Sequence, residues 1–271
     1  MSDAYRTLIN SITGNGMAFE IYEFNRKAHG ASSIGSQTPT AAPATGSTSS
    51  AAPHIHLHVP SPQVWRQVRI VLTGGGSLLE PGALQYAKGK LVVEVQKLNA
   101  KSNIFSRAIA AAGTGEAGFA TSYTGHGEVW TEPTTKHFIV ASMEQPKDAL
   151  LLDDRAFYAC ENTINLKTHI HSSVQGLFSG NGLMQPKLEG TGTFVIECPV
   201  PANEIEEIAV QPGEEVIVDG EMLLMYSASL QVELKPLVKG LRNLYRSGEG
   251  LVYKIKGQGT VWITPTVNIG Q

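Results

Sequence analysis

The chain has 271 residues, of which 42% are hydrophobic, so it is long enough to bury a sizeable core. Its formal net charge of −3 provides no general electrostatic attraction to nucleic acid or to an anionic membrane. No apolar run in the sequence approaches the roughly 18 residues that a transmembrane helix needs. The 28 glycines and 14 prolines favour short strands joined by many turns.

The first residues predict a helix followed by a strand. Tyr5, Leu8, Ile9 and Ile12 have the spacing of one helix face, and the glycines around Asn15 would end that helix. Residues 17–24 then alternate as in a strand. Residues 1–6 have neither a basic segment before an apolar core nor an Arg-rich amphipathic pattern, so we expect a cytoplasmic protein.

The composition changes abruptly after this strand. Residues 30–52 contain Ser, Thr, Ala, Pro and Gly in abundance and no charged residue, which predicts a flexible insertion over about 30–62. The insertion should lie between two strands of one domain. A strand is expected over 64–72, and Gly74-Gly75-Gly76 is expected to turn the chain.

A glycine-rich segment near the end of the chain occurs three times. Residues 247–263 alternate as a strand, pass through Gly257-Gln258-Gly259 and continue as a second strand, which predicts a β-hairpin. Similar segments turn at Gly125-His126-Gly127 and at Gly190-Thr191-Gly192. The turn glycines are therefore separated by 65 and 67 residues, which indicates a repeated architecture.

Each copy also has a front half. Pro81, Asp154 and Gly220 occupy one turn position, and an apolar run follows each. We predict an all-β fold with a few short helices, in which residues 1–29 precede the insertion and residues 63–271 form one domain. The domain would hold three β-sandwich repeats around a pseudo-threefold axis, at about 64–135, 136–201 and 202–271. The connecting segments 102–112, 172–178 and 235–246 are predicted to be helical.

These motifs resemble those of the altered-inheritance-of-mitochondria family, also called the mitochondrial biogenesis family. The best matching segments are 210–216, 247–251 and 257–263. The resemblance implies a fold similar to that of the tryptophan RNA-binding attenuation protein. It implies no catalytic residues, and eukaryotic members are associated with mitochondrial inner-membrane organisation. A mitochondrial location is therefore the alternative to the cytoplasm.

Alternating histidines are the strongest candidates for metal ligands. His54, His56 and His58 would project from one strand face, and His169 and His171 repeat the spacing. No acidic residue lies close by in sequence to complete either set, so solvent-facing histidines are the preferred interpretation and we assign no metal ligand. A metal-dependent enzyme of the cupin type rests on these pairs alone.

Other motifs give no catalytic or cofactor-binding residue. Residues 113–118 match G-x-G-x-x-G, but a helical segment precedes them and a strand follows, which reverses the order needed for a dinucleotide. The acidic pairs Asp153-Asp154 and Glu214-Glu215 fall in turns, where solvated carboxylates are expected. Cys160 and Cys198 are predicted to be buried free thiols. We therefore expect no enzyme and no cofactor.

Two surface features leave alternatives open. Lys235, Lys239, Arg242 and Arg246 would decorate the third connecting helix and could touch a membrane surface or an acidic partner, although a solvated helix face is the simpler interpretation. Trp130 and Trp262 occupy equivalent places and should pack in the core. The sequence thus predicts a non-catalytic β-scaffold that binds a protein partner or itself, without DNA. An RNA-binding or small-ligand module is the alternative, although the net charge disfavours RNA.

Overall fold

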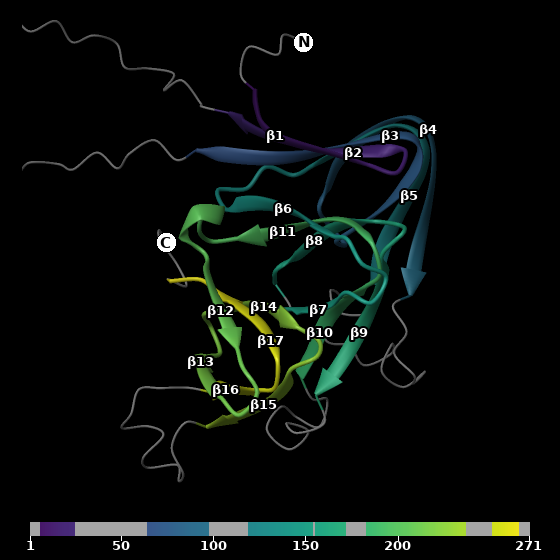
Figure 1. Ribbon diagram of the computed structural model, residues 1–271. Helices are drawn as coiled ribbons and strands as arrows, with labels where there is room; N and C mark the ends of the chain where they lie inside the picture. The colour runs from purple at the N-terminus through teal and green to yellow at the C-terminus, as the bar shows by residue number, and fades with distance from the viewer. Residues whose placement is uncertain are drawn as a thin grey trace, which may run out of the picture.

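The described part of the protein folds almost entirely into β-strands, as the sequence predicts. In the computed structural model, the residues described are 6–24, 64–97, 119–153, 155–171, 183–236 and 251–265. Within these ranges there is no α-helix, and a 3-10 turn at Ala202–Glu204 is the helical element. The strands form three sheets. Figure 1 shows β1, β2 and β3 at one end of the molecule and β12, β13, β15 and β16 at the other.

The largest sheet has eight strands. Its main path runs β1-β2-β3-β8-β11-β6, and β5 joins β3 to β4 on a branch. Its members are β1 (Thr7–Gly14), β2 (Met17–Phe24), β3 (Trp65–Leu79), β4 (Leu84–Lys97), β5 (Phe119–Thr131), β6 (His137–Met143), β8 (Phe157–Glu161) and β11 (Gly192–Cys198).

The other two sheets contain the C-terminal half of the chain. The six-stranded sheet runs in the order β12 (Glu206–Val210), β17 (Gly259–Ile263), β14 (Leu223–Ser227), β7 (Ala149–Leu152), β10 (Leu183–Glu189) and β9 (Asn165–His171). The three-stranded sheet runs in the order β13 (Glu215–Asp219), β16 (Leu251–Lys256) and β15 (Gln231–Pro236). Every strand pair in the described residues is antiparallel.

The predicted N-terminal helix is wrong, because residues 7–14 form strand β1. This strand turns at Asn15 and Gly16 and pairs along its length with β2, so that Ile12 lies opposite Phe19. The spacing of Leu8, Ile9 and Ile12 is compatible with a helix, but pairing with the edge of β2 supplies the backbone hydrogen bonds instead. β2 then pairs with β3 from Met17↔Leu72 to Phe24↔Trp65, so the two strands that flank residues 25–63 are neighbours in one sheet.

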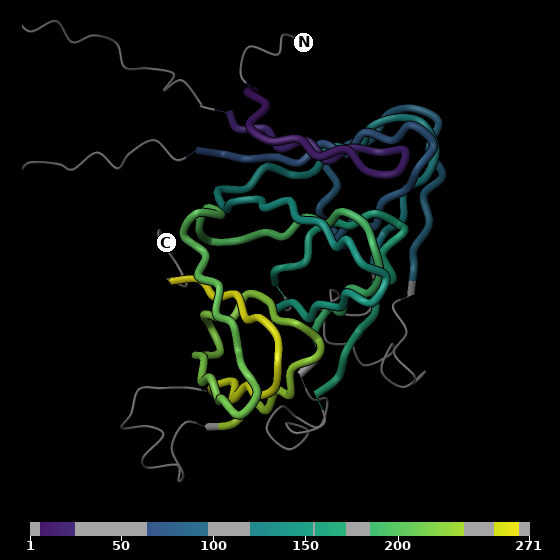
Figure 2. The backbone as a smooth tube through the Cα atoms, in the orientation of Figure 1, coloured from purple at the N-terminus to yellow at the C-terminus, as the bar shows by residue number. Residues whose placement is uncertain are grey.

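Two of the predicted glycine turns are also wrong. Gly74 to Gly76 lie within β3, which passes through an irregularity between Thr73 and Gly76 and continues to Leu79. Gly125 to Gly127 lie within β5, which runs unbroken from residue 119 to 131. Both strands bend without reversing, as the backbone tube in Figure 2 shows. Positive φ at Gly74 (112°) and Gly125 (117°) supplies the change of direction.

The other two glycine segments do reverse direction locally, but neither forms the predicted hairpin. Across Gly190, β10 pairs with β7 and β9, whereas β11 pairs with β6 and β8 of another sheet. Across Gly257, β16 pairs with β13 and β15, whereas β17 pairs with β12 and β14. Each glycine segment is therefore a corner that passes the chain from one sheet to another. Gly190 and Gly257 have φ of 103° and 119°.

The predicted front-half turns are confirmed. In all three, the backbone N–H of the fourth residue donates to the carbonyl of the first: Ala83 to Glu80, Ala156 to Asp153 and Met222 to Asp219. We call residues 80–83, 153–156 and 219–222 turns 1, 2 and 3. The threefold repeat and the pseudo-threefold arrangement stay predictions, although the two corners use the same pattern of strand pairing.

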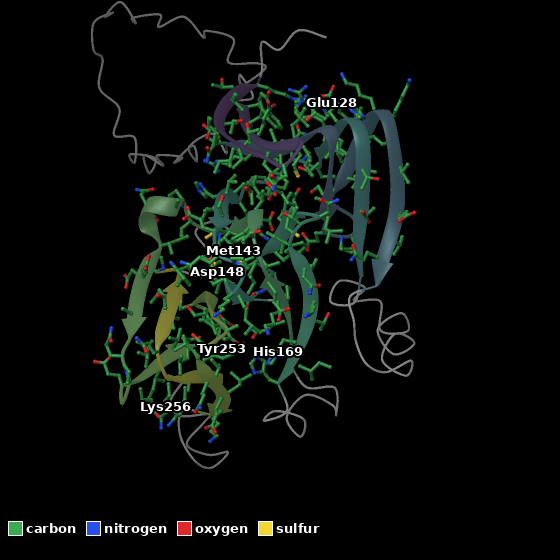
Figure 3. All side chains as sticks on the ribbon, turned by 45° about the vertical axis from the view of Figure 1, so that its right-hand side comes forward. Glu128, Met143, Asp148, His169, Tyr253 and Lys256 are labelled. Atoms are coloured by element: carbon green, nitrogen blue, oxygen red, sulfur yellow. The ribbon has the colours of Figure 1, made fainter. Side chains whose placement is uncertain are left out.

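Three clusters of buried side chains fill the space between the sheets. The first is centred on β3, with Phe19, Ile70 and Val129. The second contains Leu152, Phe194 and Met143, and the third, around β13, β15 and β16, contains Tyr226, Ile255 and Val261 among others. Figure 3 draws the side chains, with Met143 near the middle of the molecule. These three clusters fix the positions of the strands that carry the candidate sites.

Several predictions fall on residues outside those described. They are the insertion, the strand with His54, His56 and His58, the segment 113–118, and the helices at 102–112 and 172–178. The third predicted helix, at 235–246, is wrong at its start because Lys235 is part of β15 and pairs with Val252. Lys239, Arg242 and Arg246 lie outside the described residues. The domain boundaries stay predictions.

Candidate functional sites

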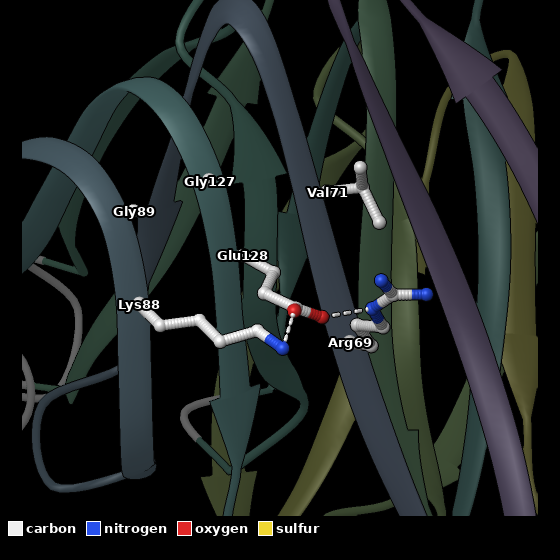
Figure 4. Close-up of a pocket in the computed structure, with 6 residues that line it drawn as sticks. All are labelled: Arg69, Val71, Lys88, Gly89, Gly127 and Glu128. Atoms are coloured by element: carbon white, nitrogen blue, oxygen red, sulfur yellow. Dashed lines mark hydrogen bonds and ion pairs between the residues drawn. The ribbon is translucent and has the colours of Figure 1, made fainter. Parts of the chain in front are cut away.

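A row of charged side chains crosses four neighbouring strands on the face of the large sheet opposite the first core. Glu128 on β5 is its centre, and only 8% of this residue is exposed. Its carboxylate accepts a hydrogen bond from Arg69 Nε at 2.5 Å and forms an ion pair with Lys88. Figure 4 shows Arg69 and Lys88 approaching Glu128 from opposite sides. Two cations thus compensate one largely buried anion.

The row continues from Arg69 to the N-terminal hairpin. Arg69 Nη1 donates to Glu20 Oε2 at 2.9 Å, and the Tyr22 hydroxyl donates to the same oxygen at 2.9 Å. Burial, reinforced by the bond to Glu20, raises the pKa of Tyr22, so its proton stays available for donation. Arg69 therefore joins two carboxylates that lie on different strands.

Trp130 lies beside this row and is covered by aromatic and cationic groups. Its ring stacks on Tyr86 at a centroid distance of 5.9 Å and tilts against Tyr22 at 5.3 Å. The guanidinium carbons of Arg6 and Arg69 lie 4.3 and 5.3 Å from its centroid, within the range of cation–π attraction. Trp130 is 7% exposed. It is buried as predicted, although its neighbours are polar as well as aromatic.

A hollow of about 360 Å³ opens over the charged row. Its lining comprises Arg69, Val71, Lys88, Gly89, Gly127 and Glu128. The two glycines of this lining lie opposite each other, where the register of β4 and β5 pairs Gly89 with Gly127. The hollow could accept a small group that complements its two cations and one anion.

A larger hollow, of about 700 Å³, lies where β6, β7, β10, β11, β14 and β17 meet. Its buried apolar side chains are Met143, Phe194 and Met225, and Trp262 forms part of its wall. Polar groups surround this apolar part, including Ser142, Lys147, Asp148, Lys187, Ser227 and Ser229. The volume falls within the range typical of small-molecule sites, and the mixture of apolar and polar groups is that of an amphipathic ligand site.

His171 of β9 is 7% exposed, so the preferred prediction of a solvent-facing histidine is wrong for it, and it joins a buried hydrogen-bond network. His171 Nε2 lies 2.7 Å from Gln185 Oε1 and 3.0 Å from the Tyr226 hydroxyl, which itself donates to Gln185 Oε1 at 2.7 Å. Both groups contact the same oxygen, and Gln185 Nε2 is buried without a hydrogen-bond partner among the described residues. Burial lowers the pKa of His171, although the bond to Gln185 partly opposes this shift.

This arrangement does not favour metal binding by His169 and His171. Their rings meet edge to face at 4.6 Å, and the only ring nitrogen of His171 with a described contact is already hydrogen-bonded. Burial lowers the pKa of His169 as well, with His171 and Lys187 adding to the effect. Among the residues with described positions, no group of three His, Cys, Asp or Glu side chains is arranged to hold a metal ion.

The remaining sequence candidates have structural contacts. Asp153 Oδ1 accepts the backbone N–H of Arg155, and Glu214 Oε2 accepts that of Gln211. Glu215 instead forms an ion pair with Lys256 at 2.8 Å, so the adjacent acids Glu214 and Glu215 have separate partners. Cys160 and Cys198 are buried free thiols, as predicted.

Comparison with known proteins identifies the family. The profile described as Mitochondrial biogenesis AIM24 matches residues 62–266, which is most of the chain. The chain belongs to this family. Its match begins just before β3 and ends just after β17, so it includes both hollows and the charged row except for the β2 side chains. A search of curated proteins found no match.

A solved structure supports the fold. The crystal structure of protein SPYM3_0169 from Streptococcus pyogenes matches this family member with a TM-score of 0.55 and 20% sequence identity. The alignment covers 77% of this chain and 91% of the streptococcal one. Such a likeness concerns the fold alone.

The sequence interpretation missed the charged row and both hollows. Strand alternation places Arg69 and Val71 on the face opposite Val68 and Ile70, so a polar outer face of β3 was within reach of the sequence. Its partners Lys88 and Glu128 were not, because they come together only through the pairing of β4 with β5. The larger hollow likewise depends on six strands from distant parts of the chain.

Proposed function

We propose that this member of the mitochondrial biogenesis AIM24 family is a non-catalytic β-scaffold that acts by binding other protein chains. The observation that carries the proposal is the composition of β4. Of the eight large hydrophobic side chains exposed among the described residues, five lie on this strand: Leu84, Tyr86, Val92, Val93 and Val95. β4 pairs only with β5 in the described structure, so its other edge also presents unpaired backbone groups.

Co-purification from the native host tests this function. We expect a tagged full-length chain to retain a stoichiometric protein partner after cross-linking, and Val93→Lys with Val95→Lys to abolish that retention. Gln231→Lys, an exposed substitution on β15, is the matched control and should retain the partner. A chain that is strictly monomeric and retains no partner would contradict the proposal.

A small-ligand function is the second candidate, and the larger hollow favours it. Lys147 and Lys187 are the cations at its rim, and Lys187 already forms an ion pair with Glu189 at 2.7 Å. The Asp148 carboxylate accepts the backbone N–H groups of Glu144 and Gln145. Figure 3 labels Asp148 close to Met143, beside the apolar part. A ligand with an apolar chain and one anionic group fits these features. Titration with a medium-chain fatty acid should change Trp262 fluorescence, and Trp262→Phe should remove that change.

RNA binding and the cellular location also remain proposals. A filter-binding assay at low and moderate salt tests RNA binding, since retention that does not depend on salt would exclude electrostatic binding.

We place the protein in the cytoplasm, and the family name makes mitochondria the alternative. Fractionation of the native host tests the location. No helix in the described part of the chain is long and apolar enough to cross a membrane.

A further inference from the structure

The pairing of β3 with β8 and the pairing of β7 with β14 share one register relative to the three turns. The residue before turn 1, Leu79, pairs with Ala159, the third residue after turn 2. The residue before turn 2, Leu152, pairs in the same way with Met225, the third residue after turn 3. In both cases two further pairs follow in the same antiparallel register, and side chains on both faces are buried.

In both internal pairings, the strand before one turn pairs with the strand after the next turn. Two strand edges have no partner of this kind among the described strands. The strand before turn 3 is β13, which pairs only with β16, and the strand after turn 1 is β4, which pairs only with β5 among the described strands. Figures 1 and 3 show β13 and β4 on opposite sides of the molecule. These two edges therefore cannot meet within one copy of the chain in this conformation.

We propose that β13 of one copy pairs antiparallel with β4 of a second copy, in the register that the two internal pairings use. Val218 would then lie opposite Tyr86, Ile217 opposite Ala87 and Val216 opposite Lys88. This inference rests on the proposed scaffold function and names a second copy of this chain as the partner. Because the two edges differ, the contact is head-to-tail and produces either a closed ring or a growing filament.

The side chains at the two edges are complementary. Ile217, with 47% of its surface accessible, would share one face with Ala87, and the exposed Tyr86 would share the other face with Val218. Continuing the register places Glu215 opposite Gly89 and Glu214 opposite Lys90. Glu214, just before β13, would thus lie directly opposite Lys90, and opposite charges across strands are favourable.

The proposed pairing also extends an existing cluster. Tyr86 already stacks on Trp130, and polar groups cover this ring. Val195, which occupies the place of Trp130 in the second copy of the predicted repeat, instead lies in the first core. Val218 belongs to the third core. Bringing Val218 against Tyr86 would therefore cover the exposed side of this aromatic pair, as Leu79 and Ala159 cover each other in the first core.

Disulfide trapping tests the register. Proteins that carry Ile217→Cys and Ala87→Cys separately are mixed under mild oxidation, because directly paired residues have Cα separations that suit a disulfide. We expect the covalent dimer at least about tenfold faster than with Val93→Cys, which lies on the same strand six residues further on, in place of Ala87→Cys. Cys160 and Cys198 are both 0% exposed and should not contribute. Equal rates for the two mixtures, or no dimer, would overturn the proposal.

Sedimentation velocity over a range of concentrations supplies a second readout. The full-length protein should sediment faster as its concentration rises, and Glu214→Lys should weaken association about fivefold because two like charges would then face each other at Lys90. Mixing that variant with Lys90→Glu should restore association. Unchanged association in the first variant would overturn the edge pairing. If the edge pairing fails but a different protein still co-purifies through Val93 and Val95, the scaffold function stands.

Discussion

Gly89 on β4 lies directly opposite Gly127 on β5, at a separation that leaves no room for a side chain between the two backbones. A Cβ atom on Gly89 would lie 2.5 Å from the Cα of Gly127, and a Cβ on Gly127 would lie 2.3 Å from the Lys88 carbonyl oxygen. Gly89 also has φ of 121°, which an L side chain rarely adopts.

Gly89→Ala is therefore expected to destabilise the protein by about 2–3 kcal/mol, because backbone strain and overlap with β5 add together. Gly82→Ala is the matched control. Gly82 has positive φ of 87°, but nothing lies within 4 Å of its Cβ position, so only strain of about 1 kcal/mol should appear. Urea unfolding of the two variants measures the difference, and equal losses would contradict the close approach.

The glycines show what the sequence could predict and what it could not. Gly125, Gly190 and Gly257 were predicted to adopt conformations that favour glycine, and all three have positive φ. Their consequences differ, since β5 bends at Gly125 without ending whereas Gly190 and Gly257 join different sheets. A local sequence determines the backbone angle at a glycine. The partner of each flanking strand depends on residues far away in the chain.

Dependence on distant strand partners also explains why the charged row was only partly predictable. Alternation predicts which side chains of one strand share a face, so the outer position of Arg69 follows from the buried positions of Val68 and Ile70. It does not predict that Glu128 will lie beside Arg69, because that depends on the pairing of β3 with β5, which places Val71 opposite Glu128 and Arg69 opposite Trp130. Long-range register is what assembles the charged row.

Glu128→Gln should destabilise the protein by about 2 kcal/mol, since it leaves Lys88 and one side of Arg69 without their anion. The loss is smaller than for a fully buried pair because 66% of the Lys88 side chain is exposed. Glu233→Gln is the control: 55% of the Glu233 side chain and 52% of its partner Lys235 are exposed, and no change in stability is expected. Chemical denaturation measures both. A loss no larger than that of the control would show that the row contributes nothing to stability.

The His171 network should make stability depend on pH. Burial holds the pKa of folded His171 below its value of about 6.5 in the unfolded chain, so the unfolded state binds more protons as the solution becomes acidic. The stabilising contribution is complete above that value and is lost as the pH falls below it. His171→Asn should therefore reduce the difference in unfolding free energy between about pH 7.5 and pH 5.5.

Tyr226→Phe is the informative comparison for this prediction. It removes the hydroxyl that contacts His171 and Gln185 but keeps the imidazole, so stability should fall at both pH values while the difference between them remains. The dependence should not vanish in His171→Asn, because burial also lowers the pKa of His169 and of His137. A full wild-type pH difference in His171→Asn would contradict the assignment.

The two cysteines should be unreactive in the folded protein. Burial raises the pKa of both thiols, which leaves little of the nucleophilic thiolate, and neither side chain is exposed to a reagent. Titration of the native protein with an aromatic disulfide reagent should release almost no chromophore, whereas the unfolded protein should react at both Cys160 and Cys198. Gln231→Cys, at an exposed position on β15, serves as a positive control and should react at once under native conditions. Rapid reaction of a native cysteine in the unsubstituted protein would mean that the core of β8 or β11 opens readily.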